Sequence, residues 1–155
     1  MAAIQGVQQG NKVILLEKND IIGRKLLLTA NGKCNLTNSS TLEVFLEKFG
    51  KNGSFYRDVF SEFSNQDLMN FFQKNGLKLK EKDDGRIFPF TEKSKSIVNV
   101  LLKVLEENNV DVNYNYCLKH LQKAFENFEL RSTKNEVIIA QSVVIATGGV
   151  TYKFT

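Results

Sequence analysis

Hydrophobic positions along the chain recur at two spacings, one typical of strands and one typical of helices. An uninterrupted apolar run from Val13 to Glu17 predicts a strand covered on both faces, as in a parallel sheet. The apolar residues of the first ten positions predict the last turns of a helix that stops at Gly10. Further helices are predicted at 42–49, 55–63, 66–75 and from Thr91 onward.

The rest of the pattern predicts short strands separated by turns. The segment at 83–89 combines a turn with an extended piece that ends at the only proline, Pro89. The last strand opens into the glycine turn Thr147-Gly148-Gly149. Helices and strands in this order predict an α/β fold with an antiparallel β-meander attached. The predicted strands and extended pieces are 77–82, 83–89, 110–115, 116–121, 125–132, 136–140 and 142–146.

Two local signals refine the helical region. Ser64 and Asp67 have the spacing of a capping box at the start of the helix at 66–75. Aromatic and apolar residues recur at helical spacing across this region, which favours a packed core over a cofactor-binding surface. These residues are Phe45, Phe49, Phe60, Phe63, Leu68, Phe71 and Phe72.

The strand ending at Glu17 and the glycine turn after residue 146 are two marks of a dinucleotide-binding fold. An acid at the carboxyl end of a parallel strand can accept both hydroxyls of a ribose, although an ordinary exposed carboxylate would fit the pattern too. Glycines after a buried strand let the backbone approach a cofactor closely. The fingerprint G-x-G-x-x-G is expected about 20 residues before the acid, and that position falls at or before Met1.

The segment 18–40 reads as a long polar loop of the kind that carries function. Backbone amides next to Gly23 and Gly32, with Arg24, Lys25 and Lys33, could hold a pyrophosphate or face an isoalloxazine ring.

Three further residues carry open alternatives. Cys34 fits packing or cofactor contact better than thiol chemistry, because no second cysteine lies nearby. Arg86 suits either an anionic substrate group or a surface turn. His120, the only histidine, favours a structural role.

Composition narrows the classes of function. The 155-residue chain has a formal charge of +4, but its basic residues are mostly lysines scattered among acids, which argues against a nucleic-acid surface. No apolar run approaches the ~20 residues that a membrane helix needs. Two distant cysteines without metal-ligand spacing predict a reducing, cytoplasmic setting and no metal site.

Four segments appear in the order and spacing of a known family. They are LLEKNDIIGRKLLLTANGKCNLTN, FSNQDLMNFF, DDGRIFPFTEKS and VVIATGGVTY. With them the chain resembles the BaiN-like (aminoacetone-oxidase-family) FAD-dependent oxidoreductases, also called YhiN-type flavoproteins. The resemblance implies an FAD-binding domain of the two-dinucleotide-binding, Rossmann-like type, and hydride transfer through FAD with NAD(P)H as partner and a small organic substrate.

The resemblance also implies roles for individual residues. Glu17 would bind the adenosine ribose with Lys18 beside it, and the backbone of Leu118 would lie near the adenine edge. Residues along the pyrophosphate and flavin, or closing over the cofactor from the second half, would be Gly23, Arg24, Lys25, Lys33, Cys34, Asn35, Ala146, Thr147 and Gly148. The resemblance assigns no general acid or base.

The departures from the family shape the expectation for this chain. The family begins with a strand and a glycine-rich turn, and it continues well beyond the length of this sequence. We therefore expect an internal fragment or a truncated gene model: one partial FAD-binding domain over 1–155, with a cofactor loop (1–40), a helical region (41–109) and a meander with the A-T-G-G turn (110–155). Such a chain should bind FAD weakly or not at all and be inactive alone. The alternative is a non-catalytic interaction domain that keeps a flavoprotein fold.

Overall fold

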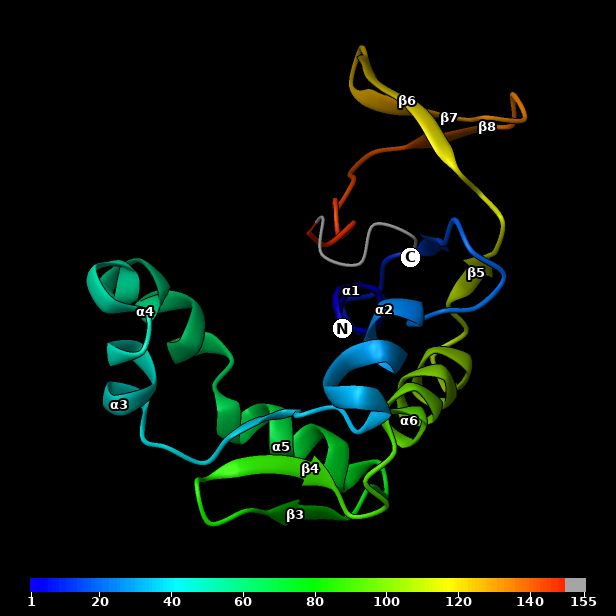
Figure 1. Ribbon diagram of the computed structural model, residues 1–155. Helices are drawn as coiled ribbons and strands as arrows, with labels where there is room; N and C mark the ends of the chain where they lie inside the picture. The colour runs from blue at the N-terminus through cyan, green and yellow to red at the C-terminus, as the bar shows by residue number, and fades with distance from the viewer. Residues whose placement is uncertain (150–155) are drawn as a thin grey trace. The chain divides into compact units, whose positions relative to one another are not determined.

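The computed structural model describes residues 1–149, which form two compact units (Figure 1). Unit 1 comprises Met1–Lys25 and the chain from Leu102 onward, and unit 2 comprises Leu26–Leu101. The last residues of the VVIATGGVTY segment, from Val150, lie outside the described residues.

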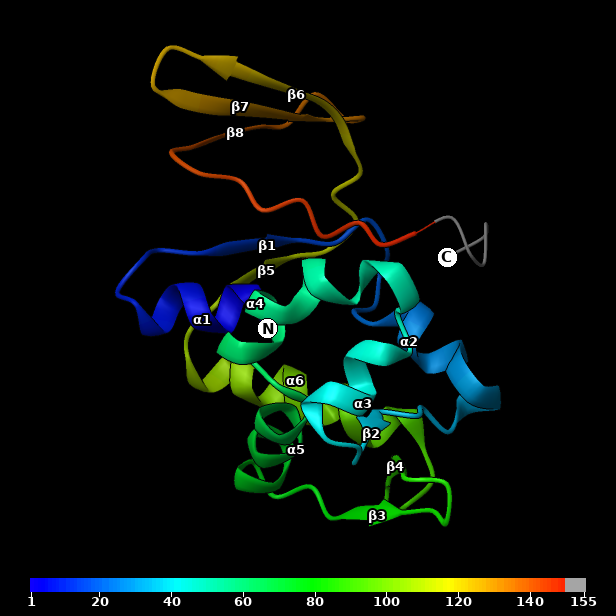
Figure 2. The ribbon, with the colours of Figure 1, turned by 90° about the vertical axis from the view of Figure 1, so that its left-hand side faces the viewer.

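Unit 1 is built on a parallel pair of strands. Strands β1 and β5 pair in register, Ile14 with Asp111 and Leu16 with Asn113, and run side by side in Figure 2. The parallel pair confirms the α/β prediction. The elements of unit 1 are α1 (Ala2–Gln8), β1 (Ile14–Leu16), β5 (Asp111–Asn113), β6 (Leu118–Ala124), β7 (Asn127–Ser132) and β8 (Val137–Ala140).

The predicted meander is present as the antiparallel sheet β6-β7-β8. Its first strand runs from Leu118 to Ala124 rather than over 116–121. Tyr116 lies outside the strand because its amide donates to the Glu17 carbonyl (3.0 Å) and not to β7. Its buried side chain places the hydroxyl 3.1 Å from the carbonyl oxygens of both Leu130 and Glu136. This residue fastens the entry of the meander to its second and third strands.

Two strand predictions in unit 1 are wrong. Residues 142–146 form no strand: they run without regular structure, with Val144 73% and Ile145 71% exposed. An extended segment becomes a strand only when a neighbour supplies its hydrogen bonds, and among the described residues the sheet of β1 has only β5. The prediction that this strand is covered on both faces is also wrong, because Ile14 in β1 is 38% exposed.

Unit 2 combines short helices with a second small sheet of strand order β2-β4-β3. Helix α5 contacts β2 and lies over this sheet in Figures 1 and 2. Its elements are η1 (Thr29–Gly32), β2 (Thr37–Asn38), α3 (Leu42–Glu47), η2 (Gly50–Asn52), α4 (Gly53–Glu62), α5 (Asn65–Lys74), β3 (Leu79–Glu81) and β4 (Arg86–Pro89). Two helices, α2 (Arg24–Leu28) and α6 (Ser94–Glu107), contain the residues at which one unit gives way to the other.

The polar segment 18–40 is therefore not the continuous loop that its composition predicts. Five good helix formers, Arg24–Leu28, make α2 directly after Gly23, whose positive φ of 74° ends the preceding turn. Leu26 then packs against the core of unit 2. The buried members of that core are Cys34, Phe72, Leu77 and Ile97.

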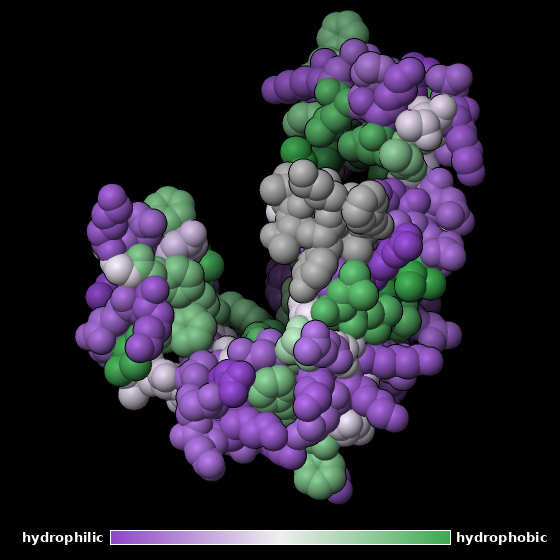
Figure 3. Space-filling view, viewed as in Figure 1, coloured by the Kyte–Doolittle hydropathy of each residue, from purple (hydrophilic) through white to green (hydrophobic). Residues whose placement is uncertain are grey.

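The helical predictions hold within a few residues. The capping box is confirmed: the Asp67 amide donates to Ser64 Oγ (3.1 Å) and the Ser64 amide donates to Asp67 Oδ2 (2.9 Å). The aromatic stripe is only partly core. The Phe45 ring packs edge-on against Phe60, with centroids 5.0 Å apart, whereas Phe63 is 42% exposed. Exposed hydrophobic side chains gather over α3 and α4 in Figure 3.

Candidate functional site

Glu17 lies where the sequence predicts a ribose-binding acid, at the carboxyl end of β1. Its amide donates to the Asn113 carbonyl (2.9 Å), so the residue continues the parallel pairing with β5. The amide and the side-chain nitrogen of Asn19 both donate to Glu17 Oε1, each at 2.8 Å. The carboxylate is thereby held in one orientation, and among the described residues its Oε2 has no hydrogen-bond donor.

Arg24 is joined to the same turn. Its guanidinium donates to the Asn19 side-chain oxygen at 3.2 Å, so Asn19 bridges a carboxylate and a cation. An acceptor suited to hydroxyl groups and a donor suited to phosphate oxygens therefore lie on either side of one asparagine. Neither the spacing of these residues nor the family resemblance predicts the bridging role of Asn19.

The structure also brings part of the glycine turn to this segment. Lys25 Nζ donates to the carbonyl oxygen of Gly149. Gly148 has a positive φ of 72°, and a Cβ at that position would lie 3.6 Å from Lys25 Nζ. The space there would admit a Cβ, so Gly148 suits the position through its positive φ.

Four more of the predicted residues of unit 1, Lys18, Leu118, Ala146 and Thr147, are exposed. Lys18 follows Glu17, Leu118 opens β6, and Ala146 and Thr147 precede the glycines. His120 is exposed on β6, away from any metal-ligating group in the described chain.

The three other predicted residues, Lys33, Cys34 and Asn35, belong to unit 2. Cys34 is 6% exposed, and desolvation by burial raises the pKa of its thiol despite a hydrogen bond with Thr29 that lowers it. A low thiolate content makes the thiol unreactive, so the packing interpretation is supported over thiol chemistry. The side-chain amide of Asn35 is assigned with its nitrogen toward two backbone carbonyls. In this orientation the nitrogen donates to the carbonyl oxygens of Ile87 (3.2 Å) and Thr37 (3.0 Å).

Unit 2 contains a second cluster, built on the β3–β4 hairpin. Lys80 pairs directly with Phe88 across the two strands, and the Lys82 amide donates to the Arg86 carbonyl (2.9 Å). Because side chains alternate along a strand, these four residues share one face of the hairpin. The turn between them closes at Gly85, whose positive φ of 76° suits a three-residue hairpin loop.

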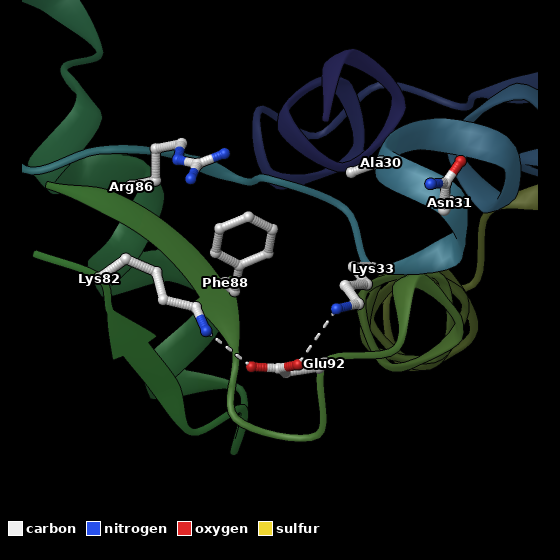
Figure 4. A pocket seen from close by; sticks show the side chains of 7 residues that line it. All are labelled: Ala30, Asn31, Lys33, Lys82, Arg86, Phe88 and Glu92. Carbon is white, nitrogen blue, oxygen red and sulfur yellow. Dashed lines mark hydrogen bonds and ion pairs between the residues drawn. The ribbon is translucent and has the colours of Figure 1, made fainter. Parts of the chain in front are cut away.

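This face lines a hollow of about 360 Å³ (Figure 4). Its aromatic wall is Phe88: the Lys82 ammonium and the Arg86 guanidinium lie 5.9 Å and 5.8 Å from the ring centroid, within cation–π range. The lining residues are Ala30, Asn31, Lys33, Lys82, Arg86, Phe88 and Glu92.

Glu92 organises the lysines around the hollow. Its carboxylate lies 2.7 Å from Lys80 Nζ, 2.9 Å from Lys82 Nζ and 3.6 Å from Lys33 Nζ. The hydrogen bonds from Lys80 and Lys82 lower the pKa of Glu92 to about 2. The carboxylate therefore stays ionised at any physiological pH and holds three flexible cations in one place.

For Arg86 the sequence left two roles open, binding an anionic substrate group or a place in a surface turn. Its position in the lining of the hollow favours the first role. Its Nε donates to Asp84 Oδ2 at 2.7 Å, which fixes the guanidinium over Phe88 and leaves its terminal nitrogens facing the hollow in Figure 4. The sequence argument missed Lys80, Lys82, Phe88 and Glu92. Alternation on either side of the Asp83–Gly85 turn is the signal that could have found the first three.

Among the described residues, no helix is long and apolar enough to cross a membrane.

Comparison with known proteins identifies relatives of known activity. The chain is 29% identical over 138 residues to the 3-dehydro-bile acid delta(4,6)-reductase of Clostridium scindens, covering 89% of this chain and 33% of the reductase. It is 27% identical over 145 residues to the ribosomal RNA dihydrouridine synthase of Escherichia coli, covering 92% and 34%. The chain thus spans about a third of the length of the relatives that it matches.

A likeness to solved structures is weak. The Diels-Alderase PyrE3 of pyrroindomycin biosynthesis aligns with 89% of this chain and 27% of its own at 11% identity and a TM-score of 0.49.

A family model settles where the chain belongs. The model described as the HI0933-like protein Rossmann domain matches residues 1–155, the full length of the sequence. This agrees with the parallel β1–β5 pair and with the acid that follows β1. The chain therefore belongs to the HI0933-like Rossmann domain family, the family of BaiN- and YhiN-type flavoproteins.

Proposed function

We propose that this chain supplies the adenosine-ribose and pyrophosphate part of the FAD site of an FAD-dependent reductase. One observation carries the proposal: Glu17 sits at the end of a parallel strand with its carboxylate oriented by Asn19, which also holds Arg24. In dinucleotide-binding folds an acid at this point accepts the ribose hydroxyls.

Each of these residues has a defined part in binding. Glu17 Oε2 would accept a hydrogen bond from a ribose hydroxyl, while Oε1 stays with Asn19. Arg24 would donate to pyrophosphate oxygens, as guanidinium groups do at phosphate sites. The Gly148–Gly149 backbone would come close to the cofactor, because no Cβ stands in the way.

The chemistry proposed for the whole protein is reduction of a carbon–carbon double bond in an unsaturated ring. When bound, FAD would supply the hydride, received from NAD(P)H. The names of the two relatives support this choice, since a delta(4,6)-reductase and a dihydrouridine synthase both deliver hydrogen to a ring double bond. We propose a small-molecule substrate; the Escherichia coli relative makes a uridine of ribosomal RNA the second candidate.

The binding proposal is tested with adenosine diphosphate, which contains the adenosine ribose and the pyrophosphate but no flavin. Amide NMR signals of the 155-residue chain are followed during a titration of wild type, Glu17→Gln and Glu126→Gln. Glu126 is a matched control because it is an exposed glutamate of unit 1 in the β6–β7 turn.

We expect wild-type shifts confined to residues 17–25 and 146–149, the same shifts in Glu126→Gln, and their loss in Glu17→Gln. Losing a charged hydrogen-bond acceptor weakens binding by about tenfold or more. Shifts that persist unchanged in Glu17→Gln, or that appear only elsewhere, would refute the proposed role of Glu17. A chain without any response would favour the non-catalytic interaction domain.

A further inference from the structure

We infer that the hollow lined by the β3–β4 hairpin and residues 30–33 binds an oxyanion, a carboxylate or a phosphate, attached to the flat body of the substrate. The inference rests on the proposed function, because it names the substrate class of the same reductase. It adds a recognition site in unit 2 that is separate from the residues proposed for ribose and pyrophosphate.

The residues that line the hollow carry a surplus of positive charge. Three of the residues that line the hollow are cationic, Lys33, Lys82 and Arg86, and only one, Glu92, is a carboxylate. The neighbouring Lys80 and Asp84, which pair with Glu92 and Arg86, cancel each other in charge. Glu81 lies between Lys80 and Lys82, but its carboxylate accepts a hydrogen bond from Ser39 on the other face of the hairpin. A surplus of two positive charges therefore remains at the hollow.

The cationic side chains at the hollow are held in place by neighbouring carboxylates. Glu92 gathers three lysines, and Asp84 holds the guanidinium of Arg86 through Nε alone, at 2.7 Å. The terminal nitrogens of Arg86 have no acceptor among the described residues, and they form the two-pronged donor that matches a carboxylate or phosphate. An arriving oxyanion would meet donors already in position.

The walls of the hollow also fit such a ligand in shape and chemistry. The ring of Phe88 stands between Arg86 and Lys82 on one side and Lys33 on the other (Figure 4). Ligand sites typically combine an aromatic or apolar wall with a few convergent polar groups in about 300–1,000 Å³, and this hollow has about 360 Å³. A flat ring resting on Phe88 with its oxyanion toward Arg86 fits these walls.

The same features favour substrate over the cofactor pyrophosphate. Pyrophosphate sites are built from backbone amides at a glycine turn and a helix N-terminus, whereas this hollow offers side chains and an aromatic ring. It also contains the ionised carboxylate of Glu92, which would repel the second phosphate group of a pyrophosphate if that group lay against Lys33. A single oxyanion beside Arg86 avoids that repulsion.

The test is a calorimetric titration of the 155-residue chain, without FAD, with two probes. 2-Naphthoate presents a carboxylate on a flat ring, and uridine 5′-monophosphate presents a phosphate beside a flat ring. Naphthalene-2-methanol and uridine are their uncharged counterparts. The variants are Arg86→Gln and Lys82→Gln, with Lys78→Gln as control, because Lys78 is an exposed lysine just before β3 and does not line the hollow.

We expect saturable binding of at least one charged probe, and no binding of its uncharged counterpart. Arg86→Gln and Lys82→Gln should each weaken it by about fivefold, and Lys78→Gln and Glu17→Gln should leave it unchanged. Binding of 2-naphthoate alone assigns a carboxylate, binding of the nucleotide alone assigns a phosphate, and binding of both assigns oxyanion recognition without selection between them.

Three results would overturn the inference: no binding of either charged probe, an equal loss in Lys78→Gln, or displacement of the probe by adenosine diphosphate. The last would assign the hollow to the cofactor. Because Arg86 and Lys82 are at the surface of the hairpin, a folding check by circular dichroism suffices to validate both variants. If neither charged probe binds but adenosine diphosphate still shifts the amide signals of residues 17–25, this inference is refuted and the proposed FAD site is not.

Discussion

Replacing Gly85 by alanine should destabilise unit 2 through two separable effects. Gly85 closes the β3–β4 hairpin with φ of 76°, a conformation that costs an L-residue about 1–2 kcal/mol. In addition, a Cβ at Gly85 would lie 3.1 Å from each of three atoms: Nδ2 and Oδ1 of Asn38 and Oγ of Ser39. These neighbours would have to move by a few tenths of an ångström.

Asn38 cannot move without loosening its own hydrogen bonds. Its Nδ2 donates to the Asp84 carbonyl at 3.1 Å, and its Oδ1 accepts from the Ser40 amide at 2.8 Å. Loss of one such hydrogen bond costs about 1 kcal/mol. We therefore expect Gly85→Ala to lower the free energy of unfolding by about 2–3 kcal/mol, the sum of the backbone and contact contributions.

Gly76→Ala is the matched control. Gly76 also belongs to unit 2 and has φ of 86°, but a Cβ there would have no neighbour within 4 Å. Both substitutions restrict the unfolded chain equally, so the difference between them isolates the contact with Asn38. In urea unfolding followed by far-UV circular dichroism, Gly85→Ala should lose about 1 kcal/mol more than Gly76→Ala. Equal losses, or no loss in either variant, would refute this reasoning.

Further predictions concern a helix cap, a thiol and a carboxylate. Ser64→Ala should cost about 1 kcal/mol in urea unfolding because it removes the capping box of α5; an unchanged midpoint would contradict the cap. With an excess of a thiol reagent, Cys117 should react at once and Cys34 only after unfolding, since Cys34 is buried and its thiol pKa is raised; two fast equivalents would contradict this. The folded-state pKa of Glu92, about 2, lies below its ordinary 4.5, so its stabilisation is present above pH 4.5 and is lost as the pH falls toward 2. Wild type should therefore lose stability relative to Glu92→Gln in that window, and parallel acid-unfolding curves would show otherwise.

Local patterns in the sequence predict local structure well. The capping box at Ser64 and the turn at Gly85 depend on residues three or four positions apart, so the residue types at these positions are enough to predict them. Glu17 was also predicted correctly at the end of its strand, because an apolar run followed by an acid specifies both the strand and its end.

Contacts between segments that are far apart in the sequence were not predicted correctly. Residues 142–146 have the composition of a buried strand, yet a strand exists only with a neighbour, and composition does not report which segments meet. Similarly, Glu92 was missed because its partners Lys33 and Lys80 lie far from it and from each other in sequence.

The cofactor claim itself is tested most directly by a flavin titration. The 155-residue chain, and the same chain extended at its N-terminus by a strand and a G-x-G-x-x-G turn of the dinucleotide-binding type, are titrated with FAD. Binding is followed by quenching of flavin fluorescence and by the visible spectrum. The account predicts weak binding by the chain alone, tighter and saturable binding by the extended chain, and loss of that binding when Glu17→Gln is introduced. Failure of the extended chain to bind FAD, or binding indifferent to Glu17→Gln, would contradict it.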